Sequence, residues 1–522
     1  MEYSKTVYIK LLKLALNYRK SVIFTGLILL GLSIFSIRFI GAEMIPVMDG
    51  GSSYISIEAD SGSSLEKTEN IVNNVEEILL RVPEIEIFSS QIGAEPGSGM
   101  MSSTGASGVG QANISITFSP RNERKKDIWT LQEEIRREIA KIPGIRSFVV
   151  KELGSTAIAT TKAPLVVRIS GENSELLEKI SNELLPQINE IDGVTNLTSS
   201  WVVANPEYQF EFDRNKLEQL DLTISDVSTQ IAMAINGVES KEKFSIKNNK
   251  DITIEIKYDK EIRKNEKDIG NINIYNKYNQ KVPLRYLANI RNVKNQNIVT
   301  RENLSNSLDI LGYVKDRPLS SVTKDVEKLL KNQVFPENYK VFVTGEKDDM
   351  EESIKKLAVS LVLAVIFVYF LLVSQFKSFL HPITIMIAIP LEIIGVVFAL
   401  LLTGKYLSMP AIMGIILLTG IAVNDSIHLI DFAIEAKKEG LSPKDAMIEA
   451  GKTRFRPILM TTFSTTVGML PLALELAIGA EKYSPLATVV IGGLTSSTLL
   501  LLFIVPVVYT SFEELKNRRT KI

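Results

Sequence analysis

Cysteine is absent from the sequence, and histidine occurs only twice, as His381 and His428. The absence of cysteine excludes disulfides, zinc–thiolate sites, iron–sulfur clusters and thiol nucleophiles. Two histidines are too few for a metal site built on imidazole. The formal net charge of -1 gives no indication of nucleic-acid binding. Because no constellation of serine, cysteine or metal ligands supports an enzyme, the sequence predicts no catalytic residues, metal, cofactor or nucleic-acid partner.

Long apolar runs, in contrast, are abundant in this chain of 522 residues. Six apolar runs with few charged residues are each close to the ~20 residues that a helix needs to cross ~30 Å of hydrocarbon. The first is too long for the core of a signal peptide and is expected to remain as an anchor. The sequence therefore predicts six transmembrane helices, at about 21–40, 357–374, 381–402, 409–433, 457–477 and 485–510.

Lysine and arginine near the helix ends predict the orientation. Basic residues precede the first run, occupy the turn after the second, fill the link after the fourth and follow the sixth. Alternating sides places all four groups in the cytoplasm and the segment 41–355 outside. We expect a multi-pass protein of a bacterial or archaeal cytoplasmic membrane, with a short interfacial helix at about 443–451 in the link after the fourth run.

The outside segment contains a degenerate repeat of strand, helix, tight turn and strand. Its strands alternate apolar and polar residues, and its helices show a 3.6-residue period. Two strand–helix–strand units together make one ferredoxin-like split βαβ subdomain, so two such subdomains are expected. An α+β insertion at about 207–300 interrupts the second. The four copies begin with strands at 54–59, 113–119, 165–170 and 308–314.

Asp425 is an acidic residue within the fourth apolar run. Charged side chains inside spanning helices are rare and costly, so each is a hypothesis of function. Asp425 lies about eight residues from the cytoplasmic end, or ~12 Å deep at 1.5 Å per residue. Burial disfavours the charged carboxylate, so Asp425 is expected to bind and release protons near neutral pH.

Polar neighbours of Asp425 extend this hypothesis. His428 follows it by three residues and shares its helix face. Thr461 on the fifth run lies at nearly the same depth, and Arg454 lies two turns before Thr461. In the predicted proton relay Asp425 is the carrier and Arg454 is a movable counter-charge. The hydrogen-bond partners of Asp425 are Asn424, His428 and Thr461. The alternative is a set of polar groups that only hold helices together.

Glu392 lies near the centre of the third apolar run. An acid at that depth is neutral, paired or facing a cavity. We treat Glu392 as a possible additional intramembrane acid of the proton path, and a purely structural role as the alternative.

Several stretches resemble the resistance-nodulation-division (RND) superfamily in its hydrophobe/amphiphile efflux branch. The most specific is Arg-Phe-Arg-Pro-Ile-Leu-Met-Thr-Thr at 454–462, followed by Gly-Met-Leu-Pro-Leu at 468–472. The resemblance covers essentially the whole chain. Supporting stretches lie at 41–50, 374–379, 492–494 and 505–506.

Full-length members of this family have twelve helices and two outside domains, arranged as two similar halves. This chain resembles the second half, because Asn424-Asp425-Ser426 matches second-half patterns. Arg454 and Thr461 occupy family positions linked to proton relay, whereas Asn424 departs from the lysine often found there. The resemblance implies that the repeats form two porter subdomains along a substrate path. It also implies that the insertion is a docking subdomain for an adaptor or outer-membrane channel.

The expected architecture is an α-helical membrane part joined to an α+β extracytoplasmic part. The predicted segments are 1–40 (N-terminus and first helix), 41–160 (porter subdomain 1), 161–206 and 301–350 (porter subdomain 2), 207–300 (docking-like insertion), 351–512 (helices two to six) and 513–522 (cytoplasmic tail).

The expected function is that of a half-size subunit of an efflux transporter driven by the proton-motive force. It would export amphiphilic or hydrophobic small molecules after pairing with itself or with a first-half partner, in a trimer of twelve-helix units. Two alternatives keep the fold: a Sec-type proton-driven accessory protein for polypeptide export, and a non-transporting RND-like receptor.

Overall fold

The computed structural model describes residues 2–93, 108–152, 163–201, 205–245, 252–259, 266–295 and 300–519. The chain forms two compact units, Val202–Val299 and the remainder of the chain on either side of it. The glycine- and serine-rich stretch at 97–108 predicts a loop before the second repeat, and all of it but Gly108 lies outside the described residues. The predicted boundary at 160/161 also lies outside them.

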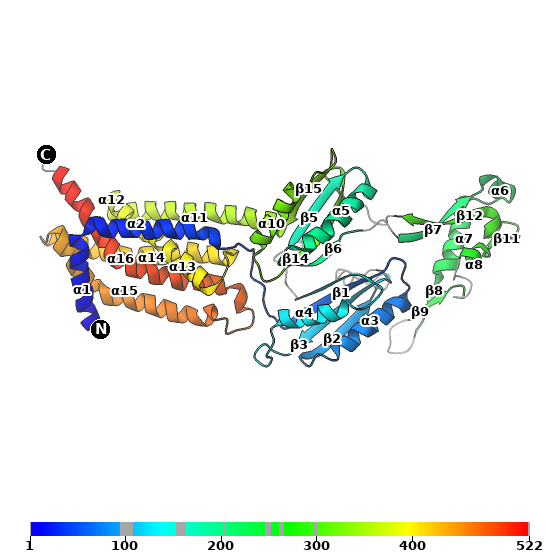
Figure 1. Ribbon diagram of the computed structural model, residues 1–522, viewed down its shortest axis with the longest axis horizontal. Helices are drawn as coiled ribbons and strands as arrows, with labels where there is room; N and C mark the ends of the chain where they lie inside the picture. Colours follow the sequence, from blue (N-terminus) through cyan, green and yellow to red (C-terminus); the bar gives the residue numbers. More distant parts are fainter. Residues whose placement is uncertain are drawn as a thin grey trace. The chain divides into compact units, whose positions relative to one another are not determined.

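Five helical segments in the described part of the chain are long and apolar enough to cross a membrane. They lie alongside one another in a bundle (Figure 1). Their bounds are α2 (Arg19–Ser36), α11 (Glu346–Phe376), α12 (Leu380–Met386) followed directly by α13 (Ala388–Thr403), α14 (Met409–Lys438) and α16 (Ser484–Arg519).

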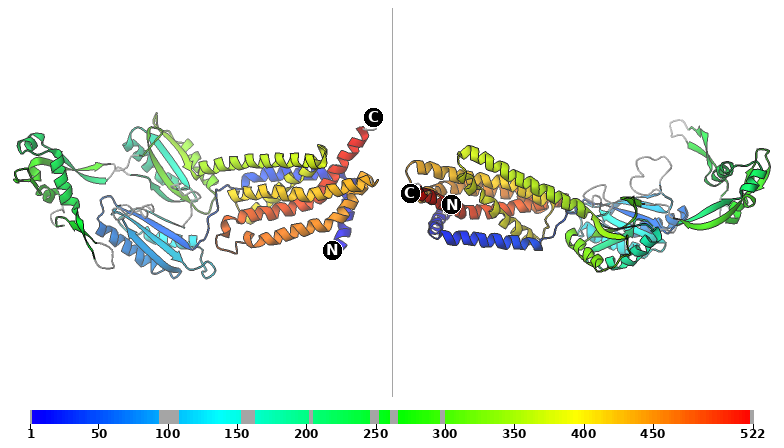
Figure 2. Two further views of the ribbon diagram at one scale, coloured as in Figure 1. Left: turned by 180° about the vertical axis from the view of Figure 1, so that it is seen from behind. Right: turned by 90° about the horizontal axis from the view of Figure 1, so that it is seen from above.

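Helix α15 (Pro443–Ala473) contains the sixth predicted run but is not among these five. Its first part carries the charged residues of the cytoplasmic link, and hydroxyl side chains at 461–466 dilute its apolar part. The helix packs along α14 and α16 (Figure 2). A membrane crossing by α15 therefore stays a prediction. The prediction of a separate short helix at 443–451 is wrong, because this segment continues without a break into α15.

An N-terminal helix, α1 (Glu2–Asn17), precedes the first span and has no counterpart in the predicted elements. Its buried side chains Tyr8 and Leu12 share a core with Phe455 of α15 and Leu502 of α16. Tyr8 Oη donates a hydrogen bond to Leu502 O at 3.2 Å. The N-terminus is thereby attached to the ends of α15 and α16 that are predicted to be cytoplasmic.

The first sheet is antiparallel, with the strand order β2-β3-β1-β4. Its two helices share one core with β1 and β3, so both cover the same face (Figure 1). Ser64 caps the first helix and Asp127 caps the second. The elements are β1 (Ser52–Ala59), α3 (Leu65–Leu79), β2 (Ile85–Ile92), β3 (Gln111–Phe118), α4 (Ile128–Ile139) and β4 (Ile145–Glu152).

The second sheet repeats this order as β6-β14-β5-β15, with the short β13 (Thr300–Glu302) also paired to β14. Residues of its two helices, such as Leu177 and Val322, are fully buried, as are Val167 and Ile310 on its strands. The elements are β5 (Leu165–Gly171), α5 (Ser174–Asn189), β6 (Val194–Ser199), β14 (Ser305–Val314), α10 (Leu319–Lys331) and β15 (Lys340–Gly345).

The unit of residues 202–299 has its own core, which includes Val227, Ile274, Leu284 and Leu287. Its first and last strands pair antiparallel with each other. The elements are β7 (Asn205–Phe212), α6 (Arg214–Gln219), α7 (Ile224–Asn236), the hairpin of β8 (Val238–Phe244) and β9 (Ile252–Ile256), α8 (Glu266–Gly270), β10 (Asn273–Tyr275), β11 (Lys281–Pro283), α9 (Leu284–Leu287) and β12 (Ala288–Asn295).

Candidate functional site

Asp425 and Thr461 come together between α14 and α15. The Asp425 side chain belongs to a residue that is only 7% exposed. The hydroxyl of Thr461 donates a hydrogen bond to Asp425 Oδ1 at 3.4 Å and another to Ile458 O at 2.9 Å. The first of these is long, so it orients the carboxyl group without holding it tightly. An acid in this position is able to take up and release a proton inside the bundle.

Asn424 and His428 lie on exposed positions of α14 on either side of Asp425 in the sequence. His428 is close enough to interact electrostatically with the carboxyl group of Asp425. Within the described part of the chain, neither residue makes a hydrogen bond to Asp425. Thr461 is likewise exposed on α15. The polar cluster therefore reaches the surface of this helix bundle.

Arg454 contacts Phe432 in this structure and does not contact Asp425. Its guanidinium group is 5.3 Å from the ring centroid of Phe432, a cation–π contact between α15 and α14. Arg454 Nε is buried and makes no hydrogen bond to the described residues. No ion pair joins Arg454 to Asp425 in the part of the chain that the structure describes.

Further hydroxyl groups extend the cluster toward α16, and the sequence reasoning missed them. The hydroxyl oxygens of Thr462 and Thr498 are 2.7 Å apart. Those of Ser426, Thr466 and Ser497 are buried without a hydrogen-bond partner among the described residues. The repeated serines and threonines within otherwise apolar helices were the sequence feature that could have predicted these hydroxyl groups.

Glu392 is 2% exposed in α13. Its Oε1 atom makes no hydrogen bond to any residue that the structure describes. Helix α13 packs closely on α16 one turn further on, where a Cβ added to Gly395 would lie 2.1 Å from Gly492 O. The acid thus sits beside a tight helix contact.

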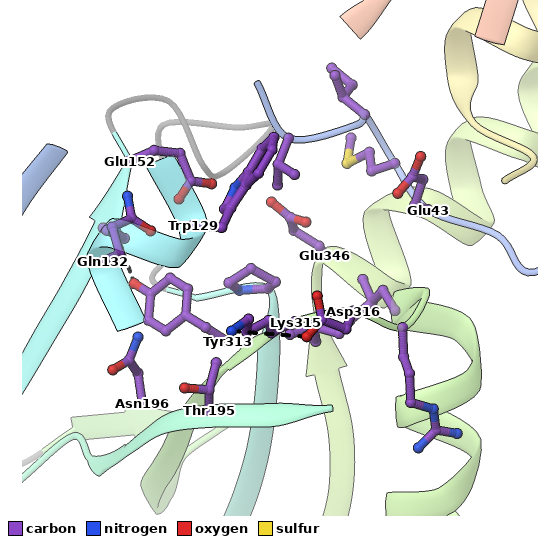
Figure 3. Close-up of a pocket in the computed structure, with 18 of the residues that line it drawn as sticks. Glu43, Trp129, Gln132, Glu152, Thr195, Asn196, Tyr313, Lys315, Asp316 and Glu346 are labelled. Carbon is purple, nitrogen blue, oxygen red and sulfur yellow. Dashed lines mark hydrogen bonds and ion pairs between the residues drawn. The ribbon is translucent and has the colours of Figure 1, made fainter. Parts of the chain in front are cut away.

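A pocket of about 330 Å³ opens where the two sheets meet the ends of the membrane helices (Figure 3). Its lining combines acidic, basic and aromatic side chains with amide and hydroxyl groups, several of which are labelled in the figure. Burial raises the pKa of Glu43 to about 7 and also raises the pKa of Glu152. The lining includes Glu43, Trp129, Lys151, Tyr313, Glu346 and Tyr406.

Lys151, in the lining of this pocket, joins the two sheets. Its Nζ atom donates a hydrogen bond to Tyr313 Oη at 2.8 Å. The same atom lies 4.8 Å from the ring centroid of Tyr54 and 4.9 Å from that of Tyr313. Burial lowers the pKa of Lys151 to about 8.

The 41–44 segment, which follows the first span, joins the second sheet to the start of α14. Ala42 N donates to Ser320 Oγ at 2.8 Å, and Ser320 N donates to Ala42 O at 3.1 Å. On its other side, Glu43 N donates to Leu407 O at 3.2 Å. Leu407 lies just before α14, the helix that carries Asp425.

A bundle of apolar helices with a buried acid, joined to an α+β part that encloses a polar pocket, defines a membrane transporter. The chain belongs to the AcrB/AcrD/AcrF family, whose model matches residues 1–513. This is a family of RND secondary transporters, which confirms the prediction of an RND transport protein that is not an enzyme.

The curated relatives are similar over almost all of this chain. The swarming motility protein SwrC of Bacillus subtilis is 28% identical over 517 residues, 98% of this chain and 48% of the relative. The nickel-cobalt-cadmium resistance protein NccA of Alcaligenes xylosoxydans is 27% identical, covering 97% and 47%. The multidrug resistance protein MdtC of Escherichia coli is 26% identical, covering 98% and 49%.

This chain therefore spans about half the length of the curated relatives it matches. A crystal structure of a heavy metal efflux pump matches 98% of this chain and 52% of its own, with a TM-score of 0.85 and 22% sequence identity. This likeness shows the fold, with its helical and β-rich parts. The relatives' names include both metal and multidrug resistance, so membership shows the transporter family and not the substrate.

Proposed function

We propose that this chain is a half-size subunit of a proton-driven RND efflux transporter for amphiphilic and hydrophobic small molecules. The buried Asp425, bonded to Thr461 across α14 and α15, carries the proposal. In it, Asp425 is the proton carrier, and Asn424, His428 and Thr461 contribute hydrogen bonds as the carboxyl group changes its charge. Arg454 is the counter-charge in another transport state, reached when it leaves Phe432. Glu392 is the further acid of the path.

Six membrane crossings, including α15, and two ferredoxin-like porter subdomains belong to this proposal. The order 2-3-1-4, counting the four main strands of each sheet along the chain, supports the second point, since it is the order of a split βαβ unit. We assign residues 202–299 as a docking subdomain. The segment between the first two spans is then periplasmic, above a bacterial inner membrane.

The exposed polar side chains at mid-helix support pairing with another half. Asn424, His428 and Thr461 lie on the surface of this bundle, within helices that are otherwise apolar. Polar groups left against lipid are unfavourable, whereas a facing helix bundle would cover them and provide partners. A second copy or a first-half protein thus completes a twelve-helix unit. Three such units form a trimer that engages an adaptor and an outer-membrane channel.

Coupling between the proton site and the porter subdomains would run through the 41–44 segment. A shift of α14 on protonation of Asp425 moves Leu407, and the hydrogen bonds of this segment pass the movement to Ser320 at the start of α10. The pocket changes shape because Glu43, one of its lining residues, belongs to the same segment.

The proposal is tested with Asp425→Asn in the purified transporter reconstituted into vesicles. The variant keeps the size of the side chain but cannot exchange a proton, so efflux driven by a pH gradient should fall to background. Asp431→Asn is the matched control, because Asp431 is an exposed acid further along the same helix. Undiminished pH-driven efflux by Asp425→Asn would refute the assignment. A secretion defect without any drug efflux would instead favour the polypeptide-export alternative, and a wild type with no transport would favour the receptor.

A further inference from the structure

The loop of residues 474–483, which joins α15 to α16, is tied to the end of α15. Lys405 Nζ and Ser484 Oγ both donate hydrogen bonds to Ala473 O, at 2.9 and 3.0 Å. Lys405 also forms an ion pair with Glu475 at 3.1 Å. A cation beside the last carbonyl groups of a helix interacts favourably with the helix dipole. The loop therefore follows any movement of the end of α15.

Glu481 lies in this loop and is 6% exposed. One of its carboxyl oxygens pairs with Arg121, which lies between β3 and α4 of the first sheet. The other oxygen is buried without a hydrogen-bond partner among the described residues, and Arg121 is the only ion-pair partner of Glu481 there. Separating a buried charge from its partner is costly, so we expect this pair to persist while the loop moves.

The segment that carries Arg121 is in turn fixed to the first sheet. Arg124 Nε donates to Ser119 O, just after β3, at 2.7 Å. Arg124 also pairs with the buried Asp49, which accepts a hydrogen bond from Ile128 N at the start of α4. A force applied at Arg121 is therefore transmitted to both β3 and α4.

Asp425 lies between the two helices that carry these connections. Thr461 of α15 donates to its carboxyl group, and α15 ends about three helical turns beyond Thr461. The start of α14 is joined to the second sheet through the 41–44 segment, whereas the end of α15 is joined to the first sheet through Glu481 and Arg121. A change in the contact between α14 and α15 therefore acts on the two sheets through separate connections.

We propose that Arg121 and Glu481 are positioning residues for transport, and that their ion pair transmits movement of α15 to the first sheet. The inference rests on the proposed function, because it takes the change of charge at Asp425 as the cause of the movement. It adds that the two sheets are moved by different helices, so they are displaced relative to each other when α14 and α15 shift.

Neutral substitutions of similar size test the pair in vesicles, with pH-driven efflux of Nile red, a neutral amphiphilic dye, as the probe. Arg121→Gln and Glu481→Gln should each lower the maximal rate at least about fivefold and leave KM for the dye unchanged. The double variant should lose no more than either single one, since the effects of residues that act as a pair are not additive. Lys126→Gln is the matched control, because Lys126 lies in the same segment but pairs with Glu134 of α4.

A label on the first sheet provides a measurement that does not depend on transport. Because the chain has no cysteine, Glu123→Cys, at an exposed position near Arg121, carries a single environment-sensitive fluorophore. Asp425→Asn, which removes the charge at the proton site, should change the emission of this label in the purified transporter at pH 8. Arg121→Gln should abolish that change, whereas Lys126→Gln should preserve it.

Thermal unfolding of each variant identifies a folding defect. If Glu481→Gln fails to fold, Arg121→Gln and the label decide, because the Arg121 side chain is 42% exposed. Full efflux by both single variants, additive losses in the double variant, or an emission change that survives Arg121→Gln would overturn the inference. Efflux by the wild type without any emission change would overturn the inference alone. An emission change that requires Arg121, in a protein without efflux, would overturn the proposed function alone, and the absence of both would overturn both.

Discussion

Glu43 combines two properties at the scale of a single residue: it lines the pocket, and burial raises its pKa to about 7. Tyr406, before α14, lies close enough to interact with its charge, and Asp316 and Glu346 line the same pocket. An acid with this pKa is ionised above neutral pH and neutral below it, so the net charge of the pocket lining changes near neutral pH.

Arg124 and Asp49 form an ion pair in which both side chains are fully buried. Asp49 also accepts hydrogen bonds from Ile128 N at 3.1 Å and from Gly51 N at 3.3 Å, which fixes the chain entering the first sheet against the start of α4. Removing one partner of such a pair leaves an uncompensated buried charge and costs about 3–5 kcal/mol.

Arg124→Met should accordingly destabilise the first sheet by about 3 kcal/mol or more. Limited proteolysis of the purified protein during a urea titration, followed at fragments of residues 50–150, measures the loss. Arg81→Met is the control, because Arg81 forms only an exposed pair with Glu77. Equal resistance of the two variants would show that the buried pair contributes no net stability.

The 41–44 segment connects a helix of the second sheet to the start of a membrane helix. It has no regular secondary structure of its own, yet it bonds to the second sheet's α10 on one side and to the start of α14 on the other. Gly41 makes this close approach possible, since a Cβ there would lie 2.2 Å from Pro318 Cγ.

Gly41→Ala should loosen this connection without removing any group of the proton site or the pocket. The proline ring cannot rotate away, so the segment itself must shift. We expect pH-driven efflux to fall several-fold, while thermal unfolding of the purified protein stays close to that of the wild type. Gly31→Ala in α2, where nothing lies within 4 Å of an added Cβ, is the control. Full efflux by Gly41→Ala would rule out coupling through this segment.

Sequence periodicity predicted the local elements well, because alternation and capping are local properties. The predicted strands at 54–59, 113–119, 165–170 and 308–314 coincide with β1, β3, β5 and β14. The N-terminal helix was missed because its apolar stripe is short and mixed with lysine. The continuity of α15 was missed because the predicted apolar run began only at 457, after the charged link, whereas Pro457 lies inside one helix.

The candidate site was predicted in part. The pairing of Asp425 with Thr461 follows from equal depth on neighbouring helices, which the sequence reveals. The position of Arg454 against Phe432 depends on side-chain packing, and the sequence does not reveal that packing. The pocket was beyond prediction, because its lining comes from segments as far apart as Glu43, Trp129, Tyr313 and Tyr406.

The polar side chains of Asn424, His428 and Thr461, which reach the surface of the helix bundle, allow the assembly of the whole molecule to be tested. Because the chain has no cysteine, a single introduced thiol reports its surroundings without background. Asn424→Cys in native membranes should be linked to a second polypeptide by a short bifunctional thiol–amine reagent, and Phe24→Cys on α2 should give much less product.

Mass analysis of the linked product identifies the partner as a second copy or as a different protein. Either result agrees with a facing half that covers the cluster. Absence of any product, together with efflux by a purified six-helix monomer, would contradict the proposed twelve-helix unit.

The register of β7 and β12 places Asn205 directly opposite Asn295, so the inserted unit begins and ends at adjacent points. A unit with its own core and neighbouring ends behaves as an inserted domain. It can be excised and replaced by a short glycine–serine turn, or grafted in place of the corresponding segment of a relative, without stretching the sheet into which it is inserted. If this unit docks partners as proposed, partner choice outside the membrane is separable from cargo choice and from the energy source, and the three can be exchanged independently.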